Sequence, residues 1–246
     1  MDIRDLMQQY RAGNRDFREV DLAGFNLYSI HFNEANLCRA NLHHIKLIGA
    51  SLRQCNLSET ILDEADLTGA NLSGSNLNWA RLVGATLNGA NLHQASLIEA
   101  HMSRAKLFEA DLSEAILSWA DLSWAKLYET QLSWANLNGA NLSRARLVAA
   151  SLSEANLSEA NLETADLSYA DLREAKLSFA NLEDAVLRRA NLSGADLRDA
   201  NLTGTDLTDA KLSWANLTGA DISEAQLSLA ANLEGVIFPD GSTHEA

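Results

Sequence analysis

Basic and aromatic residues recur at intervals of 20 residues in the middle of the chain. Three such series run in parallel: Arg104, Trp124 and Arg144; Lys106, Lys126 and Arg146; and Phe108, Tyr128 and Val148. Arg, Trp and Tyr are enriched among the residues that contribute most to protein–protein binding, and an Arg beside a Trp allows a cation–π contact. If residues 20 apart lie side by side, these residues form one surface, which we call the basic patch, and the spacing predicts a protein-binding site.

A second interpretation of the basic patch stays open. The stems of Lys and Arg side chains can simply cover exposed aromatic rings on a solvated face. Glu109 and Glu129, at the neighbouring corner, are expected to neutralise part of its positive charge. Most of the other tryptophans are expected to cover turns, and Trp119 and Trp134 are the two predicted to extend the patch.

Histidine and cysteine, which often serve in catalysis and metal binding, form no constellation in the sequence. The six histidines stand at outward or tail positions, and the adjacent His43 and His44 are expected to diverge. Cys55 replaces an inward-facing residue and Cys38 lies outside, so the two thiols predict no disulfide framework. Phosphate-binding glycine loops, Cys-x-x-Cys pairs and nucleophile motifs do not occur. We therefore predict no catalytic residues, no cofactor, no metal site and no enzyme activity.

All these positions belong to a repeat of five residues. A large apolar residue stands at every fifth position from Phe17 to Leu227, and it is Leu except at Phe17, Phe32, Met102 and Ile222. A small residue, usually Ala, precedes it by two positions, with Asn or Asp between them. On a helix each step of five turns the Leu by about 140°, and on a flat strand an odd step reverses its face. The period therefore predicts a chain that turns a corner once in each pentad.

Each pentad is expected to contain a short side and a corner. Leu points inward, its two neighbours point outward, and Ala points inward at the corner, where a larger side chain would crowd the axis. Glycine two residues after Leu, as at Gly69 and Gly139, suits the backbone of a turn. With four corners in each coil, residues 20 apart stack about 4.8 Å from each other, which predicts about eleven coils in a rod roughly 50 Å long.

The Ala-Asn/Asp-Leu-Ser/Thr-x pentads resemble those of the pentapeptide-repeat family. The resemblance implies an all-β fold, a right-handed quadrilateral parallel β-helix with a short N-terminal capping helix. The opening Arg-Asp-Phe at residues 15–17 and the ending Pro-Asp-Gly-Ser-Thr-His at residues 239–244 are similar to those of cyanobacterial members, among them a regulator of heterocyst differentiation.

The repeat divides the chain into three segments, at residues 1–14, 15–238 and 239–246. The first is predicted to be a capping helix with Ile3, Leu6, Met7 and Tyr10 on one face, covering the first coil. The second is the β-helix and the third is a tail.

The far end of the β-helix is expected to be open. The phase of the repeat slips by one residue at Leu229 and Ala230 and resumes in the new frame. Because stacked coils leave unpaired backbone groups at an open end, this coil predicts a homodimer through the C-terminal end, with a capped monomer as the alternative.

The formal net charge of −14 repels bare nucleic acid and favours solubility. The chain has no apolar signal segment and no run long enough to span a membrane, so we expect a cytoplasmic location. We predict a non-enzymatic scaffold or regulator that binds a protein partner, which the cyanobacterial resemblance implies is a regulatory protein.

Two alternatives remain. The resemblance also allows an acidic mimic of DNA acting on DNA gyrase or another DNA-binding protein, because some family members act in this way. The net charge fits, while the unbroken repeat and the basic patch argue against it. The other alternative is a purely structural spacer.

Overall fold

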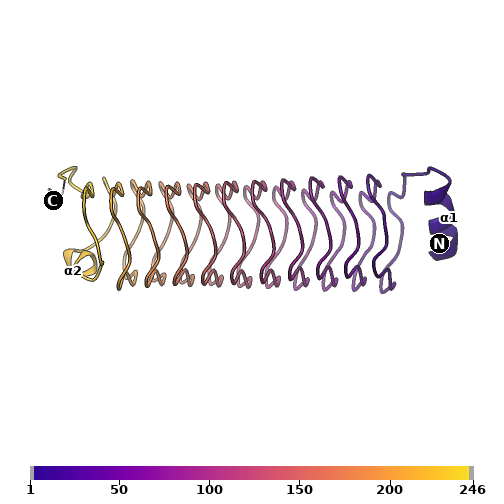
Figure 1. The fold of residues 1–246 in the computed structure, drawn as a ribbon, viewed down its shortest axis with the longest axis horizontal. Helices are drawn as coiled ribbons and strands as arrows, with labels where there is room; N and C mark the ends of the chain where they lie inside the picture. The colour runs from indigo at the N-terminus through magenta and orange to yellow at the C-terminus, as the bar shows by residue number, and fades with distance from the viewer. Residues whose placement is uncertain (1–2, 244–246) are drawn as a thin grey trace.

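The computed structural model describes residues 3–243 and shows a long rod with a helix at each end (Figure 1). Helix α1 spans Ile3–Arg11 and helix α2 spans Glu224–Leu227. Between them the chain winds in successive coils, so that the N-terminus and the C-terminus lie at opposite ends of the rod.

Residues 20 apart in sequence lie side by side. Parallel bridges join the Asn or Asp position of each pentad to the same position 20 residues later, from Asp16 with Asn36 to Asn201 with Asp221. Each pentad also contains one turn, so four turns complete a coil and give it four sides. The extended part of each side is only long enough for a single bridge. The coils are therefore joined by columns of isolated parallel bridges and not by long strands.

Every backbone N–H of a typical pentad is used, as residues 65–69 show. Ala65 donates to the leucine carbonyl of the preceding pentad at 3.0 Å, and Asp66 donates to the preceding coil at 2.9 Å. Leu67 and Gly69 donate to the following coil at 2.7 and 2.9 Å. The remaining N–H, of Thr68, donates to Oδ1 of Asp66 at 3.1 Å. Asn or Asp is thus favoured before Leu because its side chain satisfies the one donor that the coils leave unpaired.

The turn lies one residue earlier than the sequence predicts. Both residues after Leu form it, and the Ala N–H closes it on the leucine carbonyl. The second of these residues, the corner position, is left-handed, with φ of 62° at Gly69 and 60° at Trp124. A positive φ at this point is what a type II turn requires.

The interior holds the Leu and Ala columns, as predicted. The Leu side chains along the rod are buried, and so are the Ala side chains between them. Where a hydroxyl replaces Ala it donates to a leucine carbonyl, as Thr130 does to Leu107 at 2.8 Å and Thr205 to Leu182 at 2.8 Å. Within residues 3–243 no buried side-chain polar atom lacks a hydrogen bond, so these substitutions carry no desolvation penalty.

Aromatic rings seal the N-terminal end. The Tyr10 ring of α1 packs on Phe32 with centroids 4.7 Å apart, and Phe32 meets Phe17 edge to face at 5.2 Å. The Tyr10 hydroxyl donates to the Asn33 carbonyl at 3.1 Å, and the fully buried Leu6 adds apolar contact.

The C-terminal end differs from the prediction. The last pentads keep the five-residue spacing, but residues 224–227 form α2 in place of a side of the coil. Ser223 caps the helix, and the Gln226 side chain donates to the carbonyls of Leu202 at 2.6 Å and Thr205 at 3.1 Å. Bridges resume 21 residues apart, from Lys211 to Asn232, as the slipped frame requires.

Candidate protein-binding surface

The basic patch is built on one side of the rod. Parallel bridges join Lys106 to Lys126 and Lys126 to Arg146, so three basic residues occupy the Asn position of three successive coils. The same column holds Thr86 before them and Asp166 after them. All three basic side chains are exposed. Stacked like charges repel each other, so this column is less stable than the Asn columns elsewhere.

Two aromatic contacts orient the arginines of the patch. The Arg144 guanidinium lies 4.8 Å from the centroid of the Trp124 ring, in cation–π geometry. Arg146 donates through Nη1 to the Tyr128 hydroxyl at 2.9 Å, and this hydrogen bond raises the pKa of Arg146. The two guanidinium groups are therefore held against the surface.

The other members complete the surface. Arg104 and Phe108 are exposed and Val148 is half-buried. Because Lys106 cannot accept from the Phe108 N–H as an Asn would, that N–H donates instead to Oδ1 of Asn88 in the preceding coil at 3.2 Å. The structure thus places together all nine residues of the three series.

Among the described residues the cations of the patch form no ion pairs, although Asp166, next in the column, contributes to the raised pKa of Arg146. In the part of the chain that the structure describes, none of its five Lys and Arg side chains lies within 4.0 Å of a carboxylate, and Glu109 and Glu129 form no ion pair with them. Many arginines outside the patch do form ion pairs, for example Arg173 with Asp171 at 2.6 Å. The expected neutralisation by Glu109 and Glu129 is therefore not seen as ion pairing.

Trp119 and Trp134 lie away from this side. Each coil has four corners, and the patch lies between the corner of Trp124 and the corner of Glu129. Trp119 and Trp134 occupy the other two corners, which bound the opposite side of the rod. Both rings are more than half exposed, but the fold does not bring them together with the patch.

The family model for pentapeptide repeats, eight copies, matches residues 16–54, 50–89, 85–123, 125–163, 165–204 and 195–235. The chain belongs to the pentapeptide-repeat family. Its members fold as right-handed quadrilateral β-helices, in agreement with the four-sided coil described above.

Solved structures extend the comparison. This pentapeptide-repeat protein is 36% identical to HetL, a protein involved in heterocyst differentiation regulation in the cyanobacterium Nostoc sp. strain PCC 7120; the match covers 99% of this chain and 100% of HetL, with a TM-score of 0.37. It is 21% identical to QnrB1, a plasmid-mediated fluoroquinolone resistance protein, over 77% of this chain and 92% of that one, with a TM-score of 0.50. No match was found among curated proteins.

The histidines and cysteines of this pentapeptide-repeat protein follow the predictions only in part. The rings of His43 and His44 do not diverge as expected but lie 3.9 Å apart at a 52° tilt, because the left-handed backbone at His44 turns its side chain back toward its neighbour. Burial raises the pKa of the Cys55 thiol to about 11. Cys38 is half-buried, and both cysteines are free thiols. His244 lies outside the described residues.

Two further properties of residues 3–243 concern metal binding and membrane insertion. No group of three or more His, Cys, Asp or Glu side chains is arranged to hold a metal ion. None of the described helices has the length and apolar character needed to cross a membrane.

One feature of the surface was missed by the sequence prediction. Trp79 and Trp119 share a corner, with Glu99 between them, and the three line a groove of ≈ 460 Å³ together with His101 and Asp121. The spacing of 20 and 40 residues was visible in the sequence, but Trp119 had been assigned to the basic patch. An acidic residue midway between two tryptophans was the signal that pointed to a separate site.

Proposed function

We propose that this pentapeptide-repeat protein is a non-enzymatic scaffold that binds an acidic segment of a protein partner through the basic patch. One observation carries the proposal: five basic side chains on three successive coils have no carboxylate within ion-pairing distance, although the chain has a net charge of −14. Unpaired surface cations beside aromatic rings are suited to a partner that supplies the missing carboxylates.

The stability of the fold supports the same conclusion. Lys106, Lys126 and Arg146 occupy the position where Asn or Asp elsewhere accepts a backbone N–H. None of the three can accept that hydrogen bond, although the Phe108 N–H donates instead to Asn88 of the preceding coil at 3.2 Å. The missing acceptor at Lys126 and Arg146 and the stacking of three like charges both disfavour folding. Sites that lower stability without a structural gain are often functional.

The rod itself favours binding. Its coils are rigid, so the side chains of the patch are presented with little ordering cost. The whole-length identity with HetL, a protein involved in heterocyst differentiation regulation, supports a role in regulation and hence a regulatory protein as the partner. About eleven stacked coils, at roughly 4.8 Å each, would leave the sides beyond the patch free for further contacts.

The test compares two variants of equal charge. In the first, Lys106, Lys126 and Arg146 are replaced by Asn, which restores the repeat and should not harm folding. In the second, Arg173, Lys176 and Arg198, which lie outside the patch, are replaced by Ser. Partners are captured from a lysate of the source organism with each protein, identified by mass spectrometry and then measured one at a time by titration.

A partner with an acidic binding segment should bind the control variant as it binds the wild type. Its affinity for the patch variant should fall at least about tenfold, because three charged contacts are lost. Equal binding to both variants would refute the role of the patch.

Gyrase supercoiling assays provide the second arm. An acidic mimic of DNA would inhibit supercoiling. Removing the patch cations should then strengthen the inhibition, because the surface becomes more uniformly negative. The scaffold proposal expects no effect of either protein at micromolar concentration.

A further inference from the structure

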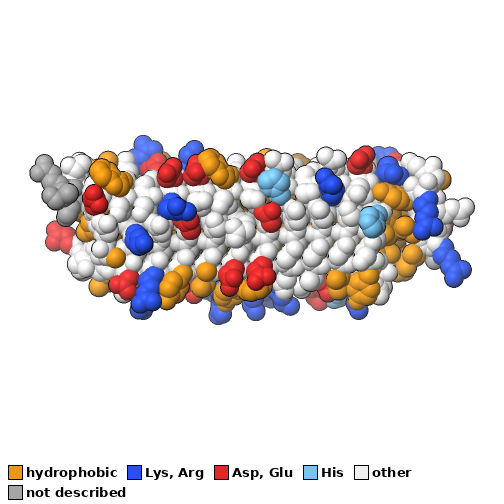
Figure 2. All heavy atoms as spheres, viewed as in Figure 1, with side chains coloured by type: hydrophobic (Ala, Val, Ile, Leu, Met, Phe, Trp, Pro, Cys, Tyr) orange, Lys and Arg blue, Asp and Glu red, His pale blue; other side chains and the backbone are white. Residues whose placement is uncertain are grey.

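We infer that the groove between Trp79 and Trp119 binds an arginine side chain of a partner protein. This inference goes beyond the proposed function and does not depend on it, because the groove and the basic patch lie on different sides of the rod. The groove is lined by Trp79, Glu99, His101, Trp119 and Asp121 and has a volume of ≈ 460 Å³. Figure 2 shows how exposed apolar and charged groups are scattered along one face of the otherwise polar rod.

The two indole rings form the walls. Trp79 and Trp119 occupy the same corner on coils that are two apart, which separates their backbones by roughly 10 Å. Trp79 is 50% and Trp119 57% exposed, so neither ring is committed to the core. A cation placed midway would lie within about 6 Å of both rings, which is the range of a cation–π contact.

The Trp119 ring is held in place by a glycine. A Cβ at Gly139, in the next coil, would lie 2.4 Å from Cε3 of Trp119, so the ring rests directly on the bare backbone there. The ring of Trp119 thus lies toward Gly139, on the side away from Glu99 and Trp79. The groove is therefore preorganised rather than formed only when a ligand arrives.

Two carboxylates, those of Glu99 and Asp121, line the groove between the rings. Within the described residues the Glu99 carboxylate accepts no hydrogen bond and forms no ion pair, although it is exposed between two aromatic rings. Asp121 accepts from Asn141 and from the Ser123 N–H through Oδ1 only. One carboxylate and one further oxygen are thus available to a ligand.

The cation in the same column as the groove is turned away. Arg81 precedes His101 and Asp121 in the same column, and it would be the natural occupant. Its guanidinium is instead paired with Asp63 through Nε at 3.0 Å and Nη2 at 2.7 Å. The groove is therefore acidic, aromatic and without an internal cation.

These features favour arginine over other ligands. A guanidinium is planar, stacks on aromatic faces and donates two parallel hydrogen bonds to a carboxylate. A lysine ammonium is a compact and strongly hydrated charge that gains less from stacking. The groove is open along the corner, so it admits the side chain of an extended protein segment lying on the rod.

The test follows the indole N–H resonances of the wild-type protein by NMR. Each of the five resonances is assigned with a Trp→Phe variant. The probe is the capped peptide acetyl-Ser-Arg-Ser-amide, and the matched peptide has Gln in place of Arg. The resonances of Trp79 and Trp119 should shift with the Arg peptide alone. Trp214, whose ring rests on Gly235 in the same way but outside the groove, should not shift.

Variants then separate the contributions. Glu99→Gln should weaken binding of the Arg peptide about tenfold, whereas Glu159→Gln, at the same corner but outside the groove, should leave it unchanged. Gly139→Ala should move the Trp119 resonance in the free protein and weaken binding.

Other results would overturn the inference. Equal shifts with the Gln peptide would show that charge is not recognised, and no shift with the Arg peptide at millimolar concentration would show that the groove is not an arginine site. Tetramethylammonium serves as a third probe: if it binds more tightly than the Arg peptide, the site is one for small quaternary cations instead.

Discussion

The basic patch and the coils that follow it have the same backbone but use their arginines in opposite ways. At Leu172 and Leu197 an Asp precedes the Leu and an Arg follows it, so the two pair across the side. Arg173 donates to Asp171 at 2.8 and 2.6 Å, and Arg198 to Asp196 at 2.8 and 2.7 Å. In the patch the cation precedes the Leu, and the residue that follows is Phe108, Tyr128 or Val148, none of which carries a carboxylate. The order of residue types around one buried Leu thus decides whether a cation is satisfied or available.

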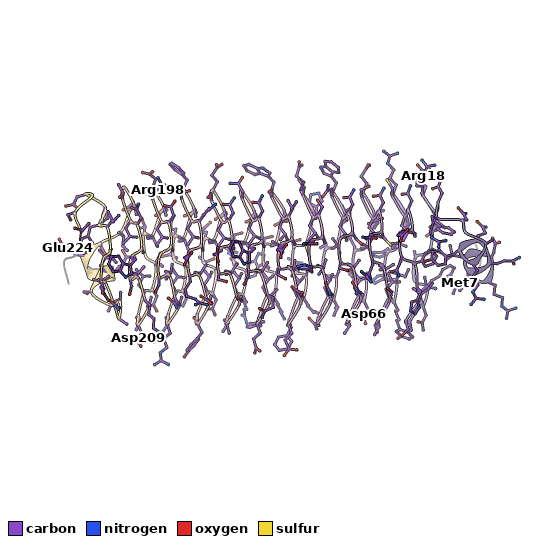
Figure 3. All side chains as sticks on the ribbon, turned by 45° about the horizontal axis from the view of Figure 1, so that its top comes forward. Met7, Arg18, Asp66, Arg198, Asp209 and Glu224 are labelled. Atoms are coloured by element: carbon purple, nitrogen blue, oxygen red, sulfur yellow. The ribbon has the colours of Figure 1, made fainter. Side chains whose placement is uncertain are left out.

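The same pairing occurs at the other end of the rod. Arg18 donates to Asp16 at 2.8 and 2.7 Å, and it lies in the same column as Arg198. Figure 3 shows both arginines along one long edge. The paired arrangement therefore recurs in distant coils, and the unpaired arrangement is a property of the patch rather than of the repeat.

The largest expected effect tests whether the two regions share one interior. Leu127, beneath the patch, and Leu177, beneath the paired coils, are both buried, with exposures of 1% and 0%. Leu→Ala at either position should lower the free energy of unfolding by about 2–5 kcal/mol, because each leaves a cavity in a packed column. Denaturant unfolding followed by circular dichroism gives the values. A much smaller loss at Leu127 would mean that the patch region is loosely packed and that the comparison fails.

A smaller effect of opposite sign is expected at the surface. Lys126→Asn should raise the free energy of unfolding by about 0.5–1.5 kcal/mol, because it restores an acceptor for the Tyr128 N–H and breaks the column of like charges. The reverse change, Asn156→Lys, removes the acceptor that Ser158 uses at 3.2 Å and places a Lys beside Lys176. It should lower stability by a similar amount. If both variants lose stability, the argument that the patch is costly is wrong.

The smallest effect concerns acid. Hydrogen bonds from Arg173 and Arg198 lower the pKa of Asp171 and Asp196 below the ordinary value of 3.8. A carboxyl group with a lowered pKa in the folded protein stabilises it above the unfolded pKa and loses that contribution as the pH falls through the folded value.

Arg173→Ser should therefore lower the melting temperature slightly at pH 7, and this effect should shrink as the pH falls below 3.8. Arg146→Ser, which removes a cation without an ion-paired carboxylate, should show a smaller dependence on pH, from the neighbouring Asp166 alone. Thermal melts of both variants across this range distinguish the two regions. A pH-dependent effect at Arg146 as large as the one at Arg173 would show that the patch cations are ion-paired after all.

Much of the fold could be predicted because the repeat is carried by the inward residues. Leu and Ala recur with little variation, and their burial leaves one geometry that satisfies the period of five. The positions of Lys106, Lys126 and Arg146 on one side follow directly from that geometry.

The exceptions arise where the spacing persists but the local chemistry changes. Ala225 and Leu227 keep the period, yet Ser223 and Gln226 form a capping box that starts α2. Because the spacing of five continues through these residues, the helix start was not predicted. Whether Arg173 pairs with Asp171, or His43 stacks with His44, depends on side-chain conformations that spacing does not determine.

The left-handed corner has a consequence for how such a surface can diversify. Positive φ is strained for side chains branched at Cβ, and among the described corner residues with positive φ Thr164 is the one of this kind. With that one exception, these corners hold glycine and residues unbranched at Cβ, and long flexible or aromatic side chains such as Glu, Arg and Trp meet that requirement. The positive φ at each corner thus favours, along the edges of the rod, several of the side chain types that are best suited to bind another protein.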